Sequence, residues 1–269
     1  MPELPEVETI ARKLDPILAG SQILSVDLRW NRSLVDLAPA EFTRQLCGQT
    51  IRSVSRRGKF LCLQLSYDQL LFHLRMSGDL DVKEGAYLPE KHDRLVLGLS
   101  GGRSMVFNDT RKFGRIWLTT DPSQVLGALG PEPLSDGFTS QVLLDMLHHR
   151  HRQLKPLLLD QTFLAGLGNI YTDEALHIAR LHPCRVSDSL TGQQVDDLWQ
   201  AIRGVLEEGI RRNGASIDWV YRGGDFQNHF RVYGRAGQAC PVCGTMIERI
   251  LVSQRGTHFC PNCQPGKDG

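Results

Sequence analysis

Two Cys-x2-Cys pairs near the C-terminus constrain the fold of that segment more than any other feature of the sequence. The four residues are Cys240, Cys243, Cys260 and Cys263. Residues 244–259 separate the pairs, a spacing typical of four-thiolate zinc sites, and redox or incidental cysteine pairs are the alternative. A four-thiolate site has no open coordination position, so we expect one structural zinc ion. Strand-like stretches at 245–252 and 257–259 predict a β-hairpin finger with Arg255 at its tip.

The 269 residues are 41% hydrophobic and 23% charged, which is an ordinary globular composition with enough apolar material for more than one core. This composition excludes wholesale disorder, collagen and a small disulfide scaffold. No apolar run approaches the roughly 18 residues that a membrane helix needs, and the N-terminus lacks a secretory signal. We therefore expect a soluble cytoplasmic protein without a membrane partner.

The net charge is only +1, so a polyanion-binding protein of this composition must concentrate its positive charge locally. Residues 42–67 carry five basic side chains and no acidic one, and four arginines between residues 231 and 255 face the single acid Glu248. Such runs indicate either a solvated face or a polyanion-binding surface.

Apolar spacing divides the chain into three regions. Residues 3–18 have the helical spacing of an amphipathic helix. From Gly20 to Leu118 the pattern is that of short strands separated by turns, which favours an antiparallel sandwich or barrel. After the Pro/Gly-rich stretch at 130–133, helical spacing returns at 138–149, 169–179 and 195–206.

The fold class expected from these patterns is α+β with several domains. We place an N-terminal helix and β-sandwich at 1–130, a linker at 131–134, a helical domain at 135–230 and the four-cysteine finger at 231–269.

The first residues of the chain are candidates for a catalytic role. If Met1 is removed, Pro2 presents a secondary amine, and such amines can attack an aldehyde-level carbon to form an iminium ion. Helix dipole and loss of water favour the neutral amine. Glu3 can donate and accept the protons of this reaction, and Glu6 lies one turn further on. The alternative is a Pro/Glu-rich helix start with no catalytic role.

Three internal segments suggest contacts to a polyanion. Residues 167–171 place glycine before a helix N-terminus, where backbone N–H groups can bind phosphate, although no Gly-Lys-Ser/Thr follows as in a nucleotide-binding loop. Residues 108–114 combine Arg111 with Phe113, which could enter a base stack, and Met76 is a second candidate wedge. Each of these segments alone is more often structural.

Taken together and in order, these segments resemble bacterial formamidopyrimidine-DNA glycosylases over essentially the whole chain. The matching parts are Met1–Thr9, Gly166–Tyr171, Val232-Tyr233-Gly234-Arg235 and the C-terminal finger. The resemblance implies a helix–two-turn–helix domain and excision of oxidised purines, such as 8-oxoguanine and formamidopyrimidines, from double-stranded damaged DNA. Strand cleavage by β,δ-elimination through a Pro2 Schiff base would follow. It also implies a monomer associated with the nucleoid.

The resemblance also assigns roles to particular residues. Pro2 would be the nucleophile and Glu3 the proton donor and acceptor. Lys59 and Arg255 would be the proton donors for β- and δ-elimination, respectively, or phosphate contacts. The remaining implied DNA contacts are His92, Arg111, Asn169, Lys155, Met76 and Phe113, of which Met76, Arg111 and Phe113 would fill the gap left by a flipped nucleotide.

Two departures from the family pattern bear on lesion preference. Lys112 stands where many relatives carry a second arginine, and residues 221–230 form a shorter segment than in relatives where this loop covers the flipped base. Alternative functions are an endonuclease VIII-like glycosylase for oxidised pyrimidines, a non-catalytic damaged-DNA binder and a purely structural zinc protein. Leu4-Pro5 argues against the first, because that branch typically has glycine before the second proline.

Overall fold

The computed structural model describes residues 1–216 and 223–266 of the chain. These residues form two compact units. Unit 1 comprises residues 1–128, 215–216 and 223–224, and unit 2 comprises residues 129–214 and 225–266. The domain boundaries expected near residues 130, 134 and 230 stay a prediction.

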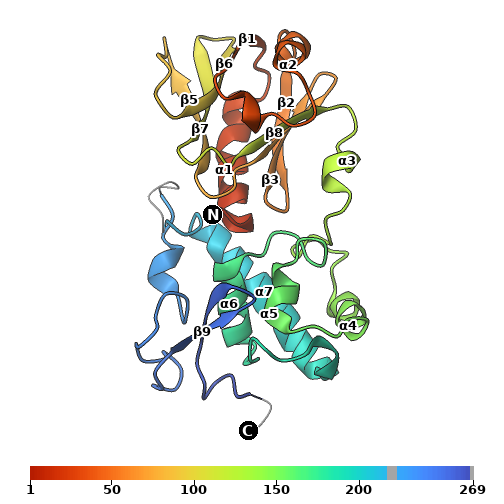
Figure 1. Cartoon of the computed structure of the whole chain (residues 1–269), viewed down its shortest axis with the longest axis vertical. Coiled ribbons are helices and arrows are strands. Elements are labelled where there is room, and N and C mark those ends of the chain that lie inside the picture. The colour runs from red at the N-terminus through yellow and green to blue at the C-terminus, as the bar shows by residue number, and fades with distance from the viewer. Residues whose placement is uncertain (217–222, 267–269) are drawn as a thin grey trace. The chain divides into compact units, whose positions relative to one another are not determined.

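The helix α1 (Leu4–Leu18) begins almost at the chain terminus, as its apolar spacing predicts. Pro5 lies in the first turn, where backbone N–H groups lack intrahelical partners in any case. The apolar stripe is buried and consists of Leu4, Val7, Ile10, Ala11, Leu14 and Leu18. Because α1 packs against strands of both sheets of unit 1, it is a core helix (Figure 1).

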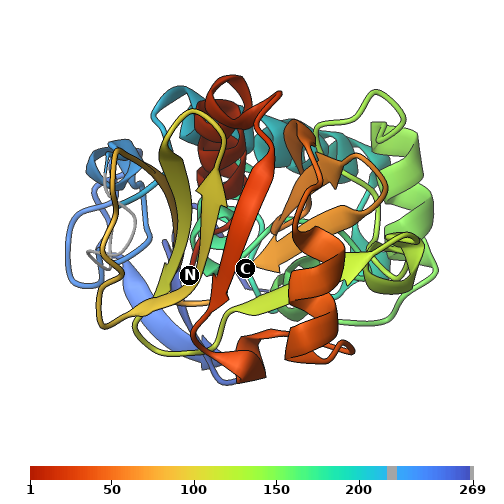
Figure 2. The same ribbon diagram turned by 90° about the horizontal axis from the view of Figure 1, so that it is seen from above.

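The described part of unit 1 contains two four-stranded antiparallel sheets (Figure 2). The first has the order β1-β6-β7-β5, with bounds β1 Ile23–Leu28, β6 Asp93–Leu99, β7 Arg103–Asp109 and β5 Gly78–Glu84. The second has the order β2-β3-β4-β8, with bounds β2 Ile51–Arg57, β3 Phe60–Leu65, β4 Gln69–His73 and β8 Arg115–Thr119. Both sheets contribute to one hydrophobic core with α1, which confirms the predicted antiparallel sandwich.

Some elements of unit 1 could not be predicted from the spacing of apolar residues. β2, β5 and the helix α2 (Pro39–Leu46) have too few alternating apolar residues to be recognised. The alternation of Leu24, Val26, Leu28 and Trp30 with polar residues predicts that all four share one face of a strand. This is wrong at Leu24, which is 56% exposed, because an irregularity in register between Ile23 and Ser25 reverses the faces of β1.

The described part of unit 2 contains four main helices. Two of them lie within two residues of the predicted bounds, the third extends beyond the predicted 195–206 at both ends, and the helix at Leu154–Leu159 was not predicted. The four helices are α4 (Ser140–His148), α5 (Leu154–Leu159), α6 (Asn169–Ile178) and α7 (Gly192–Arg211). α6 packs against α5 and α7, and also against the hairpin of the finger (Figure 1). The short helix α3 (Ser123–Leu126) precedes this unit in the chain.

The finger contains the predicted hairpin, formed by β9 (Glu248–Val252) and β10 (Arg255–Phe259). Its turn consists of Ser253 and Gln254 alone, and both have positive φ, 47° and 62°, as tight two-residue hairpins require. Arg255 pairs with Val252 and is the first residue of β10. The expectation that Arg255 lies at the tip is therefore wrong by one position.

The segment at 129–138 has no helix or strand and is held against the loop at 161–165. Gly130 N donates to Gln161 O at 2.9 Å, and Ala165 N donates to Pro131 O at 3.1 Å. A Cβ on Gly130 would lie 2.4 Å from Phe163 O, so this close approach requires glycine. Among the described helices, none has both the length and the apolar character needed to span a membrane.

Candidate functional site

The start of α1 is held by a capping box between two buried acids, Glu3 and Glu6. Glu6 accepts a hydrogen bond from Glu3 N at 2.7 Å through Oε2 and from Ala215 N at 2.8 Å through Oε1. Pro2 is buried, and Glu3 is only 3% exposed. Pro2 and Glu3 therefore occupy a defined, largely water-excluded position at the positive end of the α1 dipole.

Lys59 lies in the turn between β2 and β3. The turn is tight, with Gly58 at φ 56°, and the Lys59 side chain is buried. Arg56, at the end of β2, forms an ion pair of 2.7 Å with Glu8 in the second turn of α1. This pair fixes the β2–β3 turn against the N-terminal half of the helix that begins beside Pro2.

The positive charge of Lys59 affects His73, which pairs with Phe60 between β3 and β4. Burial, together with the positive charges of Arg75 and Lys59, lowers the pKa of His73 to about 3. His73 is therefore neutral at pH 7, and its Nδ1 accepts a hydrogen bond from Arg75 N at 3.1 Å.

Two turns of unit 1 present exposed apolar side chains. Met76, in the turn after β4, is 40% exposed, and Phe113, in the loop between β7 and β8, is 47% exposed. The guanidinium of Arg111 lies 5.0 Å from the centroid of the Phe113 ring. His92 is close to the same loop, because its carbonyl accepts a hydrogen bond from Asp109 N at 2.9 Å. The structure thus brings three of these predicted DNA contacts, His92, Arg111 and Phe113, to one end of β7.

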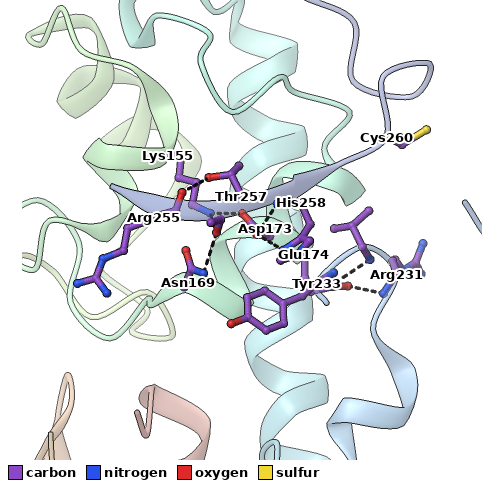
Figure 3. Close-up of polar contacts among 12 residues, drawn as sticks. Lys155, Asn169, Asp173, Glu174, Arg231, Tyr233, Arg255, Thr257, His258 and Cys260 are labelled. Carbon is purple, nitrogen blue, oxygen red and sulfur yellow. Dashed lines mark hydrogen bonds and ion pairs between the residues drawn. The ribbon is translucent and has the colours of Figure 1, made fainter. Parts of the chain in front are cut away.

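In unit 2 the predicted phosphate contacts Asn169 and Arg255 meet at Gly256 (Figure 3). Asn169 opens α6 directly after Gly168, and its Nδ2 donates to Gly256 O at 3.0 Å. The neighbouring Arg255 is exposed, and Figure 3 shows its guanidinium pointing away from the cluster. Asn169 at the N-terminus of α6 is therefore held against the backbone that follows the exposed Arg255, and such a helix N-terminus can bind an anion.

Lys155 is buried, whereas a direct contact with DNA was expected. Its side chain is 0% exposed, and its Nζ lies 2.5 Å from Asp173 Oδ1 and donates to Gly256 O at 3.1 Å (Figure 3). Asp173 Oδ2 in turn accepts from His258 N at 2.9 Å. A fully buried, ion-paired ammonium does not face a ligand, so the predicted direct DNA contact of Lys155 is not supported. Its contacts instead fix β10, which carries Arg255.

We expect Lys155→Met to lower the free energy of unfolding of unit 2 by about 3 to 5 kcal/mol, because it leaves the buried Asp173 carboxylate without its cation. An exposed DNA-contact lysine would change stability by less than about 0.5 kcal/mol. Urea unfolding followed by circular dichroism measures the difference, and the double variant Lys155→Met/Asp173→Leu should recover much of the loss. A single variant as stable as the wild type would contradict the buried ion pair.

A second buried acid on α6 organises the start of the finger. The Glu174 carboxylate accepts hydrogen bonds from the backbone N–H groups of Arg231, Val232 and Tyr233 at 2.8 to 2.9 Å. Burial raises the pKa of Glu174, and the three N–H donors partly offset this effect. The Val232-Tyr233-Gly234-Arg235 segment is thus positioned by α6.

The four cysteines of the two knuckles form the one cluster of potential metal ligands found among the described residues, with all four Sγ atoms within 4.8 Å of one another. Cys240 Sγ lies 3.9 Å from Cys263 Sγ, and Cys243 Sγ lies 3.4 Å from Cys260 Sγ. Tetrahedral Zn–S bonds of about 2.3 Å separate sulfurs by roughly 3.8 Å. The donor set and the spacing fit one structural zinc ion.

Sequence reasoning missed the residues that hold the predicted contacts in place. Asp173 and Glu174 follow Asn169 within one turn and a half of α6, and acids in the middle of an otherwise buried helix were the available signal. Asp109 lies within the segment 108–114 and Ser77 directly follows Met76, so both are neighbours of predicted contacts. Of the shortened segment at 221–230, residues 221 and 222 lie outside the described residues, and Phe226–His229 forms a 3-10 helix.

Three family models match successive parts of the chain. Residues 1–116 match the model of the formamidopyrimidine-DNA glycosylase N-terminal domain, residues 129–220 match the H2TH domain of the same glycosylases, and residues 237–266 match a zinc finger found in FPG and IleRS. A formamidopyrimidine-DNA glycosylase of Chloroflexus aurantiacus is 46% identical, with 98% of each chain covered. That of Symbiobacterium thermophilum is 44% identical, with 100% of this chain and 91% of the relative covered.

Solved structures show the same relationship. A complex of wild-type Lactococcus lactis Fpg (MutM) with DNA containing N7-benzyl-Fapy-dG superimposes with a TM-score of 0.92 at 37% identity, and 98% of this chain and 100% of that chain are covered. MutM in complex with DNA containing carbocyclic 8-oxo-G gives a TM-score of 0.91 at 37% identity, with the same coverage.

Proposed function

The chain belongs to the formamidopyrimidine-DNA glycosylase family of bifunctional glycosylases and abasic-site lyases, which act in base excision repair of oxidised purines, and we propose that Pro2 is its nucleophile. The buried arrangement at the start of α1 supports this proposal, because Pro2 and Glu3 are both buried and Glu6 fixes the Glu3 backbone next to Pro2. The substrate we propose is double-stranded DNA containing 8-oxoguanine or a formamidopyrimidine.

The first half of the reaction replaces the bond between sugar and base. The lone pair of the neutral Pro2 nitrogen attacks C1′ of the flipped nucleoside, and the damaged base leaves with the electrons of the broken bond. The Pro2 nitrogen loses its proton, the base takes one up, and the sugar ring then opens. Glu3 donates a proton to the ring oxygen and accepts one later in the sequence. The product is an iminium ion that joins Pro2 to the DNA. This step requires that Met1 has been removed.

The second half cleaves the strand. The iminium cation makes the C2′ proton acidic, so that its loss expels the 3′-phosphate, and a second elimination expels the 5′-phosphate and releases the sugar. We assign Lys59 and Arg255 to proton donation or phosphate contact in the two eliminations. Lys59 lies in the turn that Arg56 anchors to α1, and Arg255 is exposed at the start of β10.

The remaining contacts serve to bind the distorted duplex. Chemistry on a stacked base requires that the nucleotide be flipped out and that the gap be filled. Met76 and Phe113 are exposed apolar side chains and Arg111 is an exposed cation, which suits this task, while Asn169 and His92 are proposed phosphate contacts. Four thiolates leave the zinc ion no open position, so its role is to hold the finger. We propose a monomer that acts in the cytoplasm on nucleoid DNA.

A time course on a duplex containing 8-oxoguanine opposite cytosine tests this function. We expect nicked product with phosphate at both ends, and sodium borohydride should trap a covalent protein–DNA adduct that peptide mass spectrometry places on Pro2. An adduct on a lysine, or the absence of any adduct, would contradict the proposed nucleophile. Faster cleavage of a thymine glycol duplex would instead indicate the oxidised-pyrimidine specificity.

A further inference from the structure

The loop between β7 and β8 is organised around one buried carboxylate that has no part in the proposed chemistry. Asp109, the last residue of β7, is 1% exposed. Its Oδ2 accepts a hydrogen bond from Gly114 N at 2.7 Å, and its Oδ1 accepts one from Arg111 N at 3.2 Å. The carboxylate therefore spans the loop and closes it on either side of Phe113.

The same carboxylate reaches the turn that carries Met76. The hydroxyl of Ser77 donates to Asp109 Oδ1 and accepts a hydrogen bond from Arg111 N at 3.0 Å. Strand pairing explains why the two turns meet, since Gly78 at the start of β5 pairs with Asp109 at the end of β7. Ser77 thus links Met76, its neighbour in sequence, to the loop of Phe113.

The backbone of Asp109 is also held by two residues at the start of the neighbouring strand β6. Asp109 N donates to His92 O at 2.9 Å, and Arg94 Nε donates to Asp109 O at 2.7 Å. At Gly114 a Cβ would lie 2.4 Å from the Phe107 ring and 3.1 Å from Asp109 Oδ2, so the chain can approach the carboxylate only with glycine there. The polar contacts of Asp109 and the close approach of Gly114 to the Phe107 ring together hold the loop in place.

We propose that Asp109 and Ser77 are positioning residues that hold Met76 and Phe113 as one rigid wedge for insertion into the base stack. This inference rests on the proposed function. An exposed apolar side chain on a mobile turn would lose conformational freedom on entering the duplex, whereas a turn already ordered by Asp109 avoids most of that cost. The contacts of Asp109 and Ser77 act on the step that flips the nucleotide and leave the chemistry at Pro2 unchanged.

The test compares two substrates under single-turnover conditions. For Ser77→Ala and Asp109→Asn we expect excision from the 8-oxoguanine:cytosine duplex to slow by roughly ten- to hundredfold, the scale that a displacement of about 1 Å produces. Cleavage of a preformed abasic site should slow much less, because an unpaired site is easier to extrude. A 2-aminopurine opposite the lesion reports insertion of the wedge directly, and its fluorescence rise should be delayed in both variants.

Matched controls separate positioning from general damage to the fold. Asp93→Asn neutralises a buried aspartate of the same sheet, whose carboxylate accepts hydrogen bonds from Tyr87, Glu90 and Asn108. Ser21→Ala removes a buried hydroxyl that accepts a hydrogen bond from Arg103. Both controls should keep the wild-type ratio of the two rates. In a double-mutant cycle, Ser77→Ala should add little to the loss caused by Phe113→Ala, because both changes remove the same wedge.

The outcomes are distinct. Equal slowing on both substrates, normal 2-aminopurine kinetics, or additive losses in the cycle would each overturn the positioning role. If Asp109→Asn fails to fold, Ser77→Ala alone decides the question. A wild-type protein that cleaves neither substrate would instead contradict the proposed function.

Discussion

Glu3→Gln is expected to slow excision of 8-oxoguanine by roughly 10²- to 10⁴-fold, the usual contribution of a positioned general acid–base group. Glutamine has nearly the same shape as glutamate but cannot release or accept the proton that opens the sugar ring. Glu3 N donates to the Glu6 side chain, and the Glu3 side chain accepts a hydrogen bond from Glu6 N in a capping box. Because a glutamine oxygen can accept the same hydrogen bond, the start of α1 should keep its conformation. Single-turnover rates on the lesion duplex measure the effect, and gel shift measures binding, which should change little.

The double variant Pro2→Gly/Glu3→Gln extends this result and separates an enzyme from a damaged-DNA binder. It should retain affinity for the lesion duplex, with the same dependence on salt, yet produce no nick. Glu84→Gln, at the exposed end of β5, is the control for a simple change of charge. Nicking by the double variant at the wild-type rate would rule out Pro2 and Glu3 as the catalytic pair, as would methionine in the first Edman cycle of active protein.

Removal of the zinc ligand Cys260 is the second change with a large expected effect. Structural zinc contributes apparent binding free energies of about 10 to 16 kcal/mol to small fingers, so Cys260→Ser should unfold the finger. The apolar core of the finger is small, consisting of Val232, Cys240, Ile247 and Cys260 with Cys263 packed against it, and cannot compensate. Since β10 carries Arg255, affinity for damaged DNA and δ-elimination should both be lost.

Metal analysis and proteolysis measure this prediction. The wild type should contain one zinc ion per chain, and Cys260→Ser should contain none and be cut within residues 237–266. Cys47→Ser, which replaces an exposed cysteine outside the cluster, should keep the zinc and the affinity. Undiminished DNA binding after complete removal of zinc would contradict a structural role of the finger in recognition.

Local patterns in the chain were sufficient for the main elements and for the ligands of the metal. The helical spacing of α1, the period-two strands of the sandwich and the spacing of the cysteine pairs are all properties of residues close in sequence, so they can be read without a structure. The exposed turn residues Met76 and Phe113 could be identified for the same reason. Arg255 was misplaced by one position because a turn of two residues cannot be distinguished from one of four by composition.

The tertiary structure alone decided how these residues are held. Asp173 lies 85 positions before His258, Glu6 lies 209 before Ala215, and Ser77 lies 32 before Asp109. The burial of Lys155 depends likewise on Asp173 and on Gly256, 101 positions away. Periodicity and spacing report only neighbours along the chain, whereas the burial and pairing of a charge depend on segments that folding brings together. The chemistry of this protein could therefore be named from its sequence, but the carboxylates that position it could not.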